Sequence, residues 1–158
     1  MDNLAQGIQS AIDFIEQNIC EDITISQIAS KACISEFYFQ KIFGVLCSQT
    51  VGEYIRNRRL TLAAEEILST DEKIIDIALK YGYESHDSFT RAFTRFHGVS
   101  PTAAREKKAS IKSISPIRIK LKLEGGNMIE YRISQKAAFT IKGFCRRFNT
   151  ETSYTEGP

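Results

Sequence analysis

The sequence predicts an all-α domain of seven helices, followed by a short and incomplete β segment at the C-terminus. Three features indicate this: apolar residues recur every three or four positions, a set of residues repeats after about 50 positions, and strict alternation begins at residue 117. With 42% hydrophobic and 25% charged residues, the chain of 158 residues has the composition of an ordinary globular protein. Disordered, collagen-like and coiled-coil classes are therefore excluded.

Each expected helix carries a local signal. The first is indicated by an apolar stripe that includes Ile8, Ile12 and Ile15. Thr24 and Thr50 each stand three residues before a glutamine or glutamate, the pattern of a capping box that opens a helix. The expected helices cover residues 5–20, 25–32, 36–46, 51–69, 74–81 and 86–96, with a seventh starting at Pro101.

An internal repeat determines how these helices are grouped. Ala29, Phe39 and Phe43 recur as Ala78, Phe89 and Phe93, at intervals of 49, 50 and 50 residues. In each copy a short helix with a small residue is followed by a tight turn and a second helix, and the small residue allows the steep crossing of a helix-turn-helix unit. The sequence therefore predicts two helix-turn-helix units joined by the long helix 51–69.

The net charge of +2 hides an uneven distribution along the chain. Residues 1–36 carry six acids against one base, whereas residues 91–122 carry nine bases against one acid. Such polarity favours a polyanionic partner, although a solvated basic face followed by a basic linker explains the charge equally well. Together with two helix-turn-helix units, it points to double-stranded DNA, because the second helix of such a unit enters the major groove.

The outward residues of each second helix are the candidates for reading bases. In the first unit they are Glu36, Phe37, Gln40 and Lys41, and in the second His86, Asp87, Thr90 and Arg91. The candidates for phosphate contact are Arg56, Arg58 and Arg59 on the long helix and Thr94 and Arg95 on the last helix of the second unit. The alternative for every one of them is an ordinary polar helix surface.

The length of the connecting helix predicts how the DNA is held. Its 19 residues span roughly 28 Å at 1.5 Å per residue. Successive major grooves on one face of DNA are about 34 Å apart. One chain can therefore place both recognition helices in adjacent grooves only if the DNA bends toward the protein, at a cost of about 1–6 kcal/mol.

Several motifs resemble the DNA-binding domain of AraC/XylS-type transcription regulators over about residues 5–106. They are Ile28-Ala29, the run from Ser35 to Phe43, the run from Tyr54 to Leu60, Ile77-Ala78, Tyr81 to Ser85, Arg91-Ala92-Phe93, Gly98 to Pro101 and Arg105. The resemblance implies monomeric binding to asymmetric promoter sites, followed by contact with RNA polymerase, as in an activator. Cys33 stands where the family commonly has glycine, and Ala104 where a tyrosine often precedes the final arginine.

The sequence predicts three consecutive segments. Residues 1–107 form the expected DNA-binding domain and residues 108–116 a basic linker. Residues 117–158 read as strands at 117–123, 129–133 and 138–144 and resemble the start of a GyrI-like effector-binding domain, in the domain order of Rob-type regulators. Such a domain needs far more residues than are present, so a small-molecule effector is expected only where that domain is complete.

Other functional classes find little support. The chain has no phosphate-binding glycine loop, no nucleophile elbow and no metal-ligand spacing among Cys20, Cys33, Cys47 and Cys145, so no enzyme, cofactor or metal is expected. The absence of a membrane-length apolar run and of a signal peptide predicts a cytoplasmic protein that does not bind membranes. A ligand-sensing or protein-interaction module remains the main rival, because of the strand-rich tail.

Overall fold

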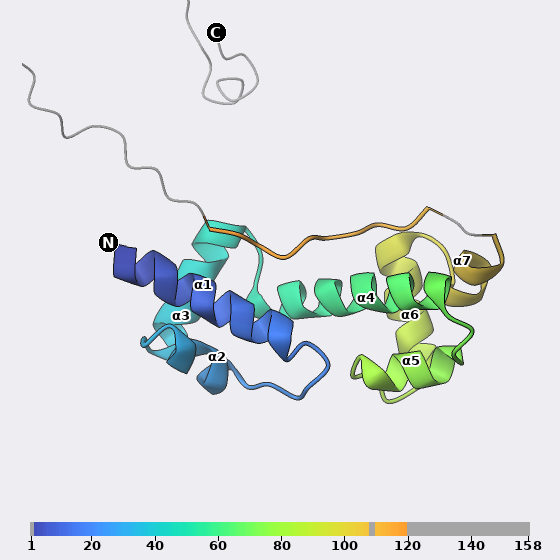
Figure 1. The fold of residues 1–158 in the computed structure, drawn as a ribbon, viewed down its shortest axis with the longest axis horizontal. Helices are drawn as coiled ribbons and strands as arrows, with labels where there is room; N and C mark the ends of the chain where they lie inside the picture. Colours follow the sequence, from blue (N-terminus) through green and yellow to red (C-terminus); the bar gives the residue numbers. More distant parts are fainter. Residues whose placement is uncertain (1, 108–109, 120–158) are drawn as a thin grey trace, which may run out of the picture. The chain divides into compact units, whose positions relative to one another are not determined.

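A computed structural model describes residues 2–107 and 110–119, which contain seven helices and, within these ranges, no strand (Figure 1). The helices are α1 (Asp2–Gln17), α2 (Ile25–Lys31), α3 (Glu36–Cys47), α4 (Val51–Ser69), α5 (Ile74–Lys80), α6 (His86–His97) and α7 (Pro101–Lys107). The prediction of seven helices is confirmed. None of the described helices is both long and apolar enough to cross a membrane.

The helix ends follow from the signals in the sequence. Both expected capping boxes form: Thr24 N–H donates to Gln27 Oε1 over 2.8 Å, and Thr50 N–H donates to Glu53 Oε2 over 2.8 Å. The first helix begins and ends three residues earlier than expected. The Asn18 side chain donates to the carbonyl oxygen of Phe14 over 2.8 Å, which satisfies one of the last helical carbonyls and ends α1.

Two apolar clusters form the core, and α4 contributes to both. The first cluster, built from α1, α2, α3 and the start of α4, includes the fully buried Phe39, Phe43 and Tyr54. The second, built from the rest of α4 with α5, α6 and α7, includes the fully buried Phe89 and Phe93. The long helix therefore serves as a shared wall for two helix groups.

The repeat extends to the backbone conformation of the turns. Cys33 and Gly82, 49 residues apart, both have positive φ values, 54° and 80°, and so do Ser48 and Gly98, at 52° and 85°. The first copy thus adopts left-handed turns with cysteine and serine where the second uses glycine, at a cost of about 1–2 kcal/mol for each non-glycine residue. Cys33 therefore does not alter the turn geometry.

The chain continues past α7 as an extended segment. Residues 110–119 run back along α4 to α1, drawn in orange in Figure 1. Ile111 packs on the second core cluster, and Ile117 and Ile119 pack on the first. Residues 117–119, the described start of the expected β segment, are extended but form no strand. The other expected strand residues lie outside the described ranges.

Candidate nucleic-acid interface

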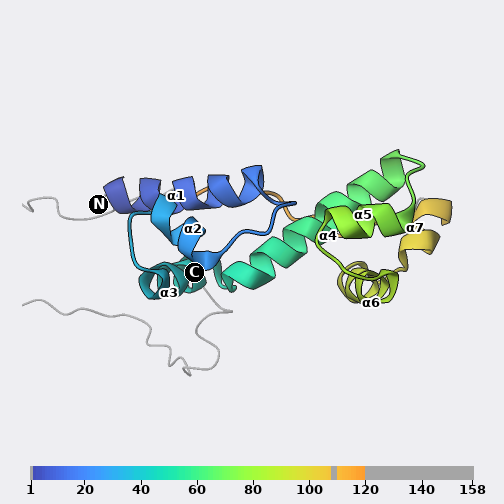
Figure 2. The same cartoon turned by 90° about the horizontal axis from the view of Figure 1, so that it is seen from below.

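The second helix of each pair lies along the same edge of the molecule in Figure 2. That view looks nearly along α3 and α6; α6 lies below α4, and α3 lies beside the N-terminal end of α4. Each begins at a serine whose hydroxyl accepts a backbone N–H, Ser35 from Tyr38 over 3.3 Å and Ser85 from Ser88 over 3.2 Å. The short helices α2 and α5 pack against them through the buried Ala29 and Ala78.

The first candidate surface lies on α3. Glu36, Phe37, Gln40 and Lys41 are all exposed, while Phe39 and Phe43, on the opposite face, are fully buried. Phe37 is 76% exposed, so its ring is accessible to a ligand. The four residues therefore share an accessible face, and their role in reading bases stays a prediction.

The second candidate surface, on α6, holds three of its four expected residues. His86, Asp87 and Arg91 are exposed, with His86 Nδ1 lying 3.8 Å from Asp87 Oδ1. Thr90 differs from expectation: it is half-buried, and its Oγ1 is enclosed without a hydrogen-bond partner in the described part of the chain. Because that hydroxyl is enclosed, the assignment of Thr90 as an outward residue is corrected.

A cleft between the two helix groups brings two of the expected phosphate contacts together. It has a volume of about 520 Å³ and is lined by Arg56 of α4 and Arg95 of α6, with Leu60 at its base. Arg56 and Arg95 are exposed, and neither forms an ion pair with a described residue. Thr94, the neighbour of Arg95, is also exposed.

The polarity of the cleft suits an anion. Glu53 is the only acid that lines it, and its carboxylate accepts both the N–H and the hydroxyl of Thr50. These hydrogen bonds lower the pKa of Glu53. Gln49 and Asn57 also line the cleft and were missed in the sequence. The polar residues Glu53, Arg56 and Asn57, at spacings of three and one on α4, are the signal that could have found Asn57. Gln49 lies just before this helix and gave no such signal.

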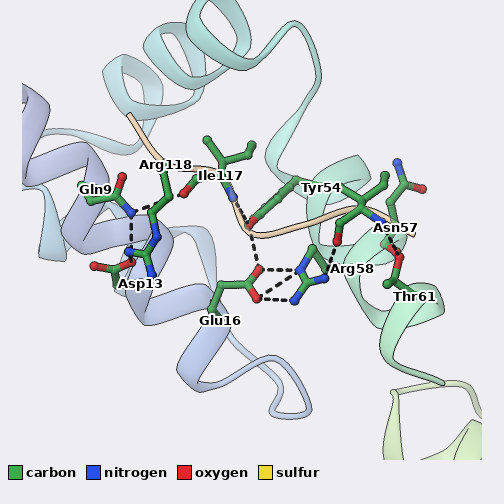
Figure 3. Close-up of polar contacts among 10 residues, drawn as sticks. Gln9, Asp13, Glu16, Tyr54, Asn57, Arg58, Thr61, Ile117 and Arg118 are labelled. Carbon is green, nitrogen blue, oxygen red and sulfur yellow. Dashed lines mark hydrogen bonds and ion pairs between the residues drawn. The ribbon is translucent and has the colours of Figure 1, made fainter. Parts of the chain in front are cut away.

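The structure corrects the assignment of Arg58 as a phosphate contact. Its guanidinium is paired with Glu16 of α1, with Nη2 2.7 Å from Oε2 and Nε 2.9 Å from Oε1 (Figure 3). The hydroxyl of Tyr54 donates to the same carboxylate over 2.7 Å. The Arg58 side chain is only 7% exposed, and its hydrogen bonds to Glu16 raise its pKa. Arg58 therefore holds α1 against α4 and does not reach a ligand.

Arg59 also has a structural role. Its Nε donates to the carbonyl oxygen of Ile19 and its Nη2 to that of Glu21, both over 2.7 Å. Its Nη1 lies where a side chain at Gly82 would be, 2.6 Å from the position of a Cβ atom. These contacts use two of the three guanidinium nitrogens, and the assignment of Arg59 to a phosphate contact stays a prediction.

Residues 28–107 match the family model described as a helix-turn-helix domain. The regulatory protein SoxS of Salmonella typhimurium is 40% identical over 102 residues, which cover 65% of this chain and 95% of SoxS. The chain belongs to the AraC-type helix-turn-helix family. The transcriptional activator AarP of Providencia stuartii is 35% identical over 98 residues, covering 62% of this chain and 73% of AarP.

A solved structure shows the same fold. The DNA-binding domain of AdpA, determined in complex with a target DNA, superposes with a TM-score of 0.60 at 20% identity and covers 65% of this chain and 92% of that chain. Members of the AraC-type family are DNA-binding regulators, so the expectation that this chain is not an enzyme is confirmed by its relatives. The match to the family model ends at residue 107, before the extended segment 110–119.

Proposed function

We propose that this protein is a transcriptional activator that inserts α3 and α6 into adjacent major grooves of one promoter duplex. In this proposal α2–α3 and α5–α6 each act as a helix-turn-helix unit. Membership of the AraC-type family supports DNA binding, and relatives named as regulators and activators support the regulatory role. The position of both helices along one edge of the molecule, nearly parallel to each other, supports simultaneous insertion (Figure 2).

The observation that carries the proposal is the cleft shared by Arg56 and Arg95. It lies over α4, between the group that holds α3 and the group that holds α6. When two helices occupy successive major grooves, the sugar-phosphate backbones between those grooves face the connector. Arg56 and Arg95, neither of which forms an ion pair with a described residue, would neutralise the phosphates there.

The base contacts are assigned by side-chain chemistry. Gln40 suits a bidentate pair with adenine, Lys41 a guanine or a phosphate, and Phe37 the methyl group of thymine. On α6, Arg91 is the best candidate for guanine, with His86 beside it. Glu36 and Asp87 would repel phosphates, so they are placed against cytosine amino groups or as supports for neighbouring side chains.

The α4 helix sets the geometry of the complex. Its 19 residues give a connector of about 28 Å. This is shorter than the spacing of about 34 Å between major grooves on one face of DNA. The bound duplex is therefore expected to bend toward the protein.

Two finer assignments complete the proposal. RNA polymerase is the partner through which a bound activator would act. The segment from residue 117 onward is assigned to the start of a GyrI-like effector-binding domain that follows a DNA-binding domain of residues 1–107 and a linker of residues 108–116. Its alternating sequence supports this, and its natural effector would be a small molecule.

Selection of bound sequences from random duplexes, followed by footprinting of the winner, tests the function. The expected footprint covers two major-groove segments about one helical turn apart on one face. About six phosphate contacts give a slope near −5 for log K against log salt concentration. A footprint confined to one groove would refute the two-helix arrangement. A nearly flat salt dependence would favour the rival, an apolar interaction module.

A further inference from the structure

The extended segment 110–119 lies beyond the part of the chain that its relatives share, and it contacts both helix groups. The family model ends at residue 107, and the 102 residues matched in SoxS already cover 95% of that protein. Ile111 packs on the second core cluster, while Ile117 and Ile119 pack on the first. The segment therefore spans the two groups that carry α6 and α3.

The middle of the segment is fixed to α4 at Ile114. The carbonyl oxygen of Ile114 accepts a hydrogen bond from Arg58 Nη1, and its N–H donates to Thr61 Oγ1 over 3.2 Å. Thr61 is fully buried and Arg58 is 6% exposed. Two polar side chains of the connecting helix, both removed from water, thus use this backbone as a second partner. Thr61 Oγ1 also donates to the carbonyl oxygen of Asn57 over 3.0 Å, and Arg58 also pairs with Glu16.

The end of the segment is fixed to α1 at Gln9. The Gln9 side-chain amide donates to the carbonyl oxygen of Ile117 over 3.4 Å (Figure 3). The same amide accepts the N–H of Ile119 over 2.8 Å. The amide thus takes the place of a neighbouring strand, which explains why an extended backbone is stable here without forming a sheet. Arg118 Nη1 lies 3.0 Å from Asp13 Oδ1 and adds an exposed ion pair.

The segment also joins the buried polar network between α1 and α4. Tyr54 donates its hydroxyl proton to Glu16 and accepts the N–H of Ile117 over 3.2 Å. Glu16 is in turn the partner of Arg58 (Figure 3), whose third guanidinium nitrogen, Nη1, donates to the carbonyl oxygen of Ile114. One connected set of hydrogen bonds therefore links α1, α4 and the segment, and such a set holds its members in a single arrangement.

We propose that residues 110–119 form a clasp that fixes the two helix groups about α4 and thereby sets the spacing of α3 and α6. The proposal rests on the proposed function, because spacing matters only if both helices engage one duplex. The clasp favours DNA sites that are read by both α3 and α6. Because the two helix groups are already fixed before binding, the free-energy cost of ordering them on the DNA is removed.

The test compares Gln9→Ala with the matched control Gln6→Ala in the full chain. Gln6 is an exposed residue on the same helix and makes no side-chain contact with the segment among the described residues. Amide hydrogen exchange at Ile117 and Ile119 reports docking without DNA. DNA affinity is measured on the selected duplex and on one in which the half read by α6 is scrambled. Ile119→Ser, which alters the clasp and no helix, provides a second variant.

We expect Gln9→Ala to speed exchange at Ile119 about tenfold and to weaken binding to the complete site about fivefold, with little change on the scrambled site. Gln6→Ala should change neither. Faster exchange with unchanged affinity in both clasp variants would overturn the proposal, and so would unchanged exchange at Ile119 in Gln9→Ala. Failure of the unaltered protein to bind any duplex would instead refute the proposed function, while exchange would still report the clasp.

Discussion

Arg59 and Arg105 hold corresponding loops in the two halves of the protein. Arg59 donates to the carbonyl oxygens of Ile19 and Glu21, in the loop between α1 and α2. Arg105 donates to those of Ile67 and Glu72, over 3.2 and 2.6 Å, around the loop between α4 and α5. The helix α4 therefore holds a loop of the first half through Arg59, as α7 holds a loop of the second half through Arg105. The repeat thus extends beyond the two helix pairs.

This relationship predicts equivalent losses of stability. Arg59→Ala and Arg105→Ala should each lower the free energy of unfolding by about 2 kcal/mol, because two charge-assisted hydrogen bonds to backbone carbonyls are lost. Urea denaturation measures the change. Arg56→Ala is the control, since an exposed arginine without a partner should alter stability by less than about 0.5 kcal/mol. A loss at Arg56 as large as that at Arg59 would contradict the assignment.

The pair formed by Arg58 and Glu16 predicts a larger effect on folding than on DNA binding. Arg58→Ala leaves the Glu16 carboxylate without its cationic partner, although Tyr54 still donates to it, and should cost about 3 kcal/mol. The double variant Glu16→Gln/Arg58→Met should lose less than the sum of the single changes, because no charge is then stranded. At temperatures where Arg58→Ala is fully folded, its salt dependence of DNA binding should equal that of the unaltered protein. A reduced slope would show that Arg58 contacts phosphate after all.

The cleft predicts a sequence-independent effect of two arginines. Arg56→Ala and Arg95→Ala should each weaken binding to specific and random DNA alike. Each should also reduce the magnitude of the log K against log salt slope by about 0.9, the contribution of one phosphate contact. Lys73→Ala, in the loop between α4 and α5, is the charge-matched control and should leave the slope unchanged. Fluorescence anisotropy titrations at several salt concentrations provide the measurement.

Two neighbours on α6 should behave differently. Arg91→Ala should cost about 1–3 kcal/mol at one operator position and little on random DNA, as expected for a base contact. Thr90→Val should leave DNA affinity unchanged and raise the free energy of unfolding by roughly 1 kcal/mol, because it removes an enclosed hydroxyl without a partner. Thr94→Val, at an exposed position, is the control for stability. Equal losses on specific and random DNA for Arg91→Ala would exclude base reading.

The sequence predicted the bounds of the helices more accurately than the hydrogen-bond partners of their side chains, and the reason is physical. Helix ends depend on neighbours three or four residues away, so Thr24 and Thr50 revealed them. The partners of Arg58 and Arg59 lie 42 and 40 residues away, on α1 and at its C-terminal end, and no local pattern encodes that distance. The docking of residues 110–119 was missed because it relies on Gln9 and Thr61, whose polarity gave no signal by itself.

The buried His97 predicts a dependence of stability on pH. It is 5% exposed, with Nε2 3.1 Å from the carbonyl oxygen of Leu60, and burial lowers its pKa below the usual 6.5. As the pH falls below about 6.5, the unfolded chain takes up a proton that the folded chain resists, so stability is lost at up to about 1.4 kcal/mol per pH unit. The loss ends below the folded-state pKa. Urea denaturation at several pH values should show this loss of stability in the unaltered protein and in the control His86→Gln. The loss should be absent in His97→Gln, which would assign it to the buried ring. An identical pH dependence in all three proteins would exclude His97 as its source.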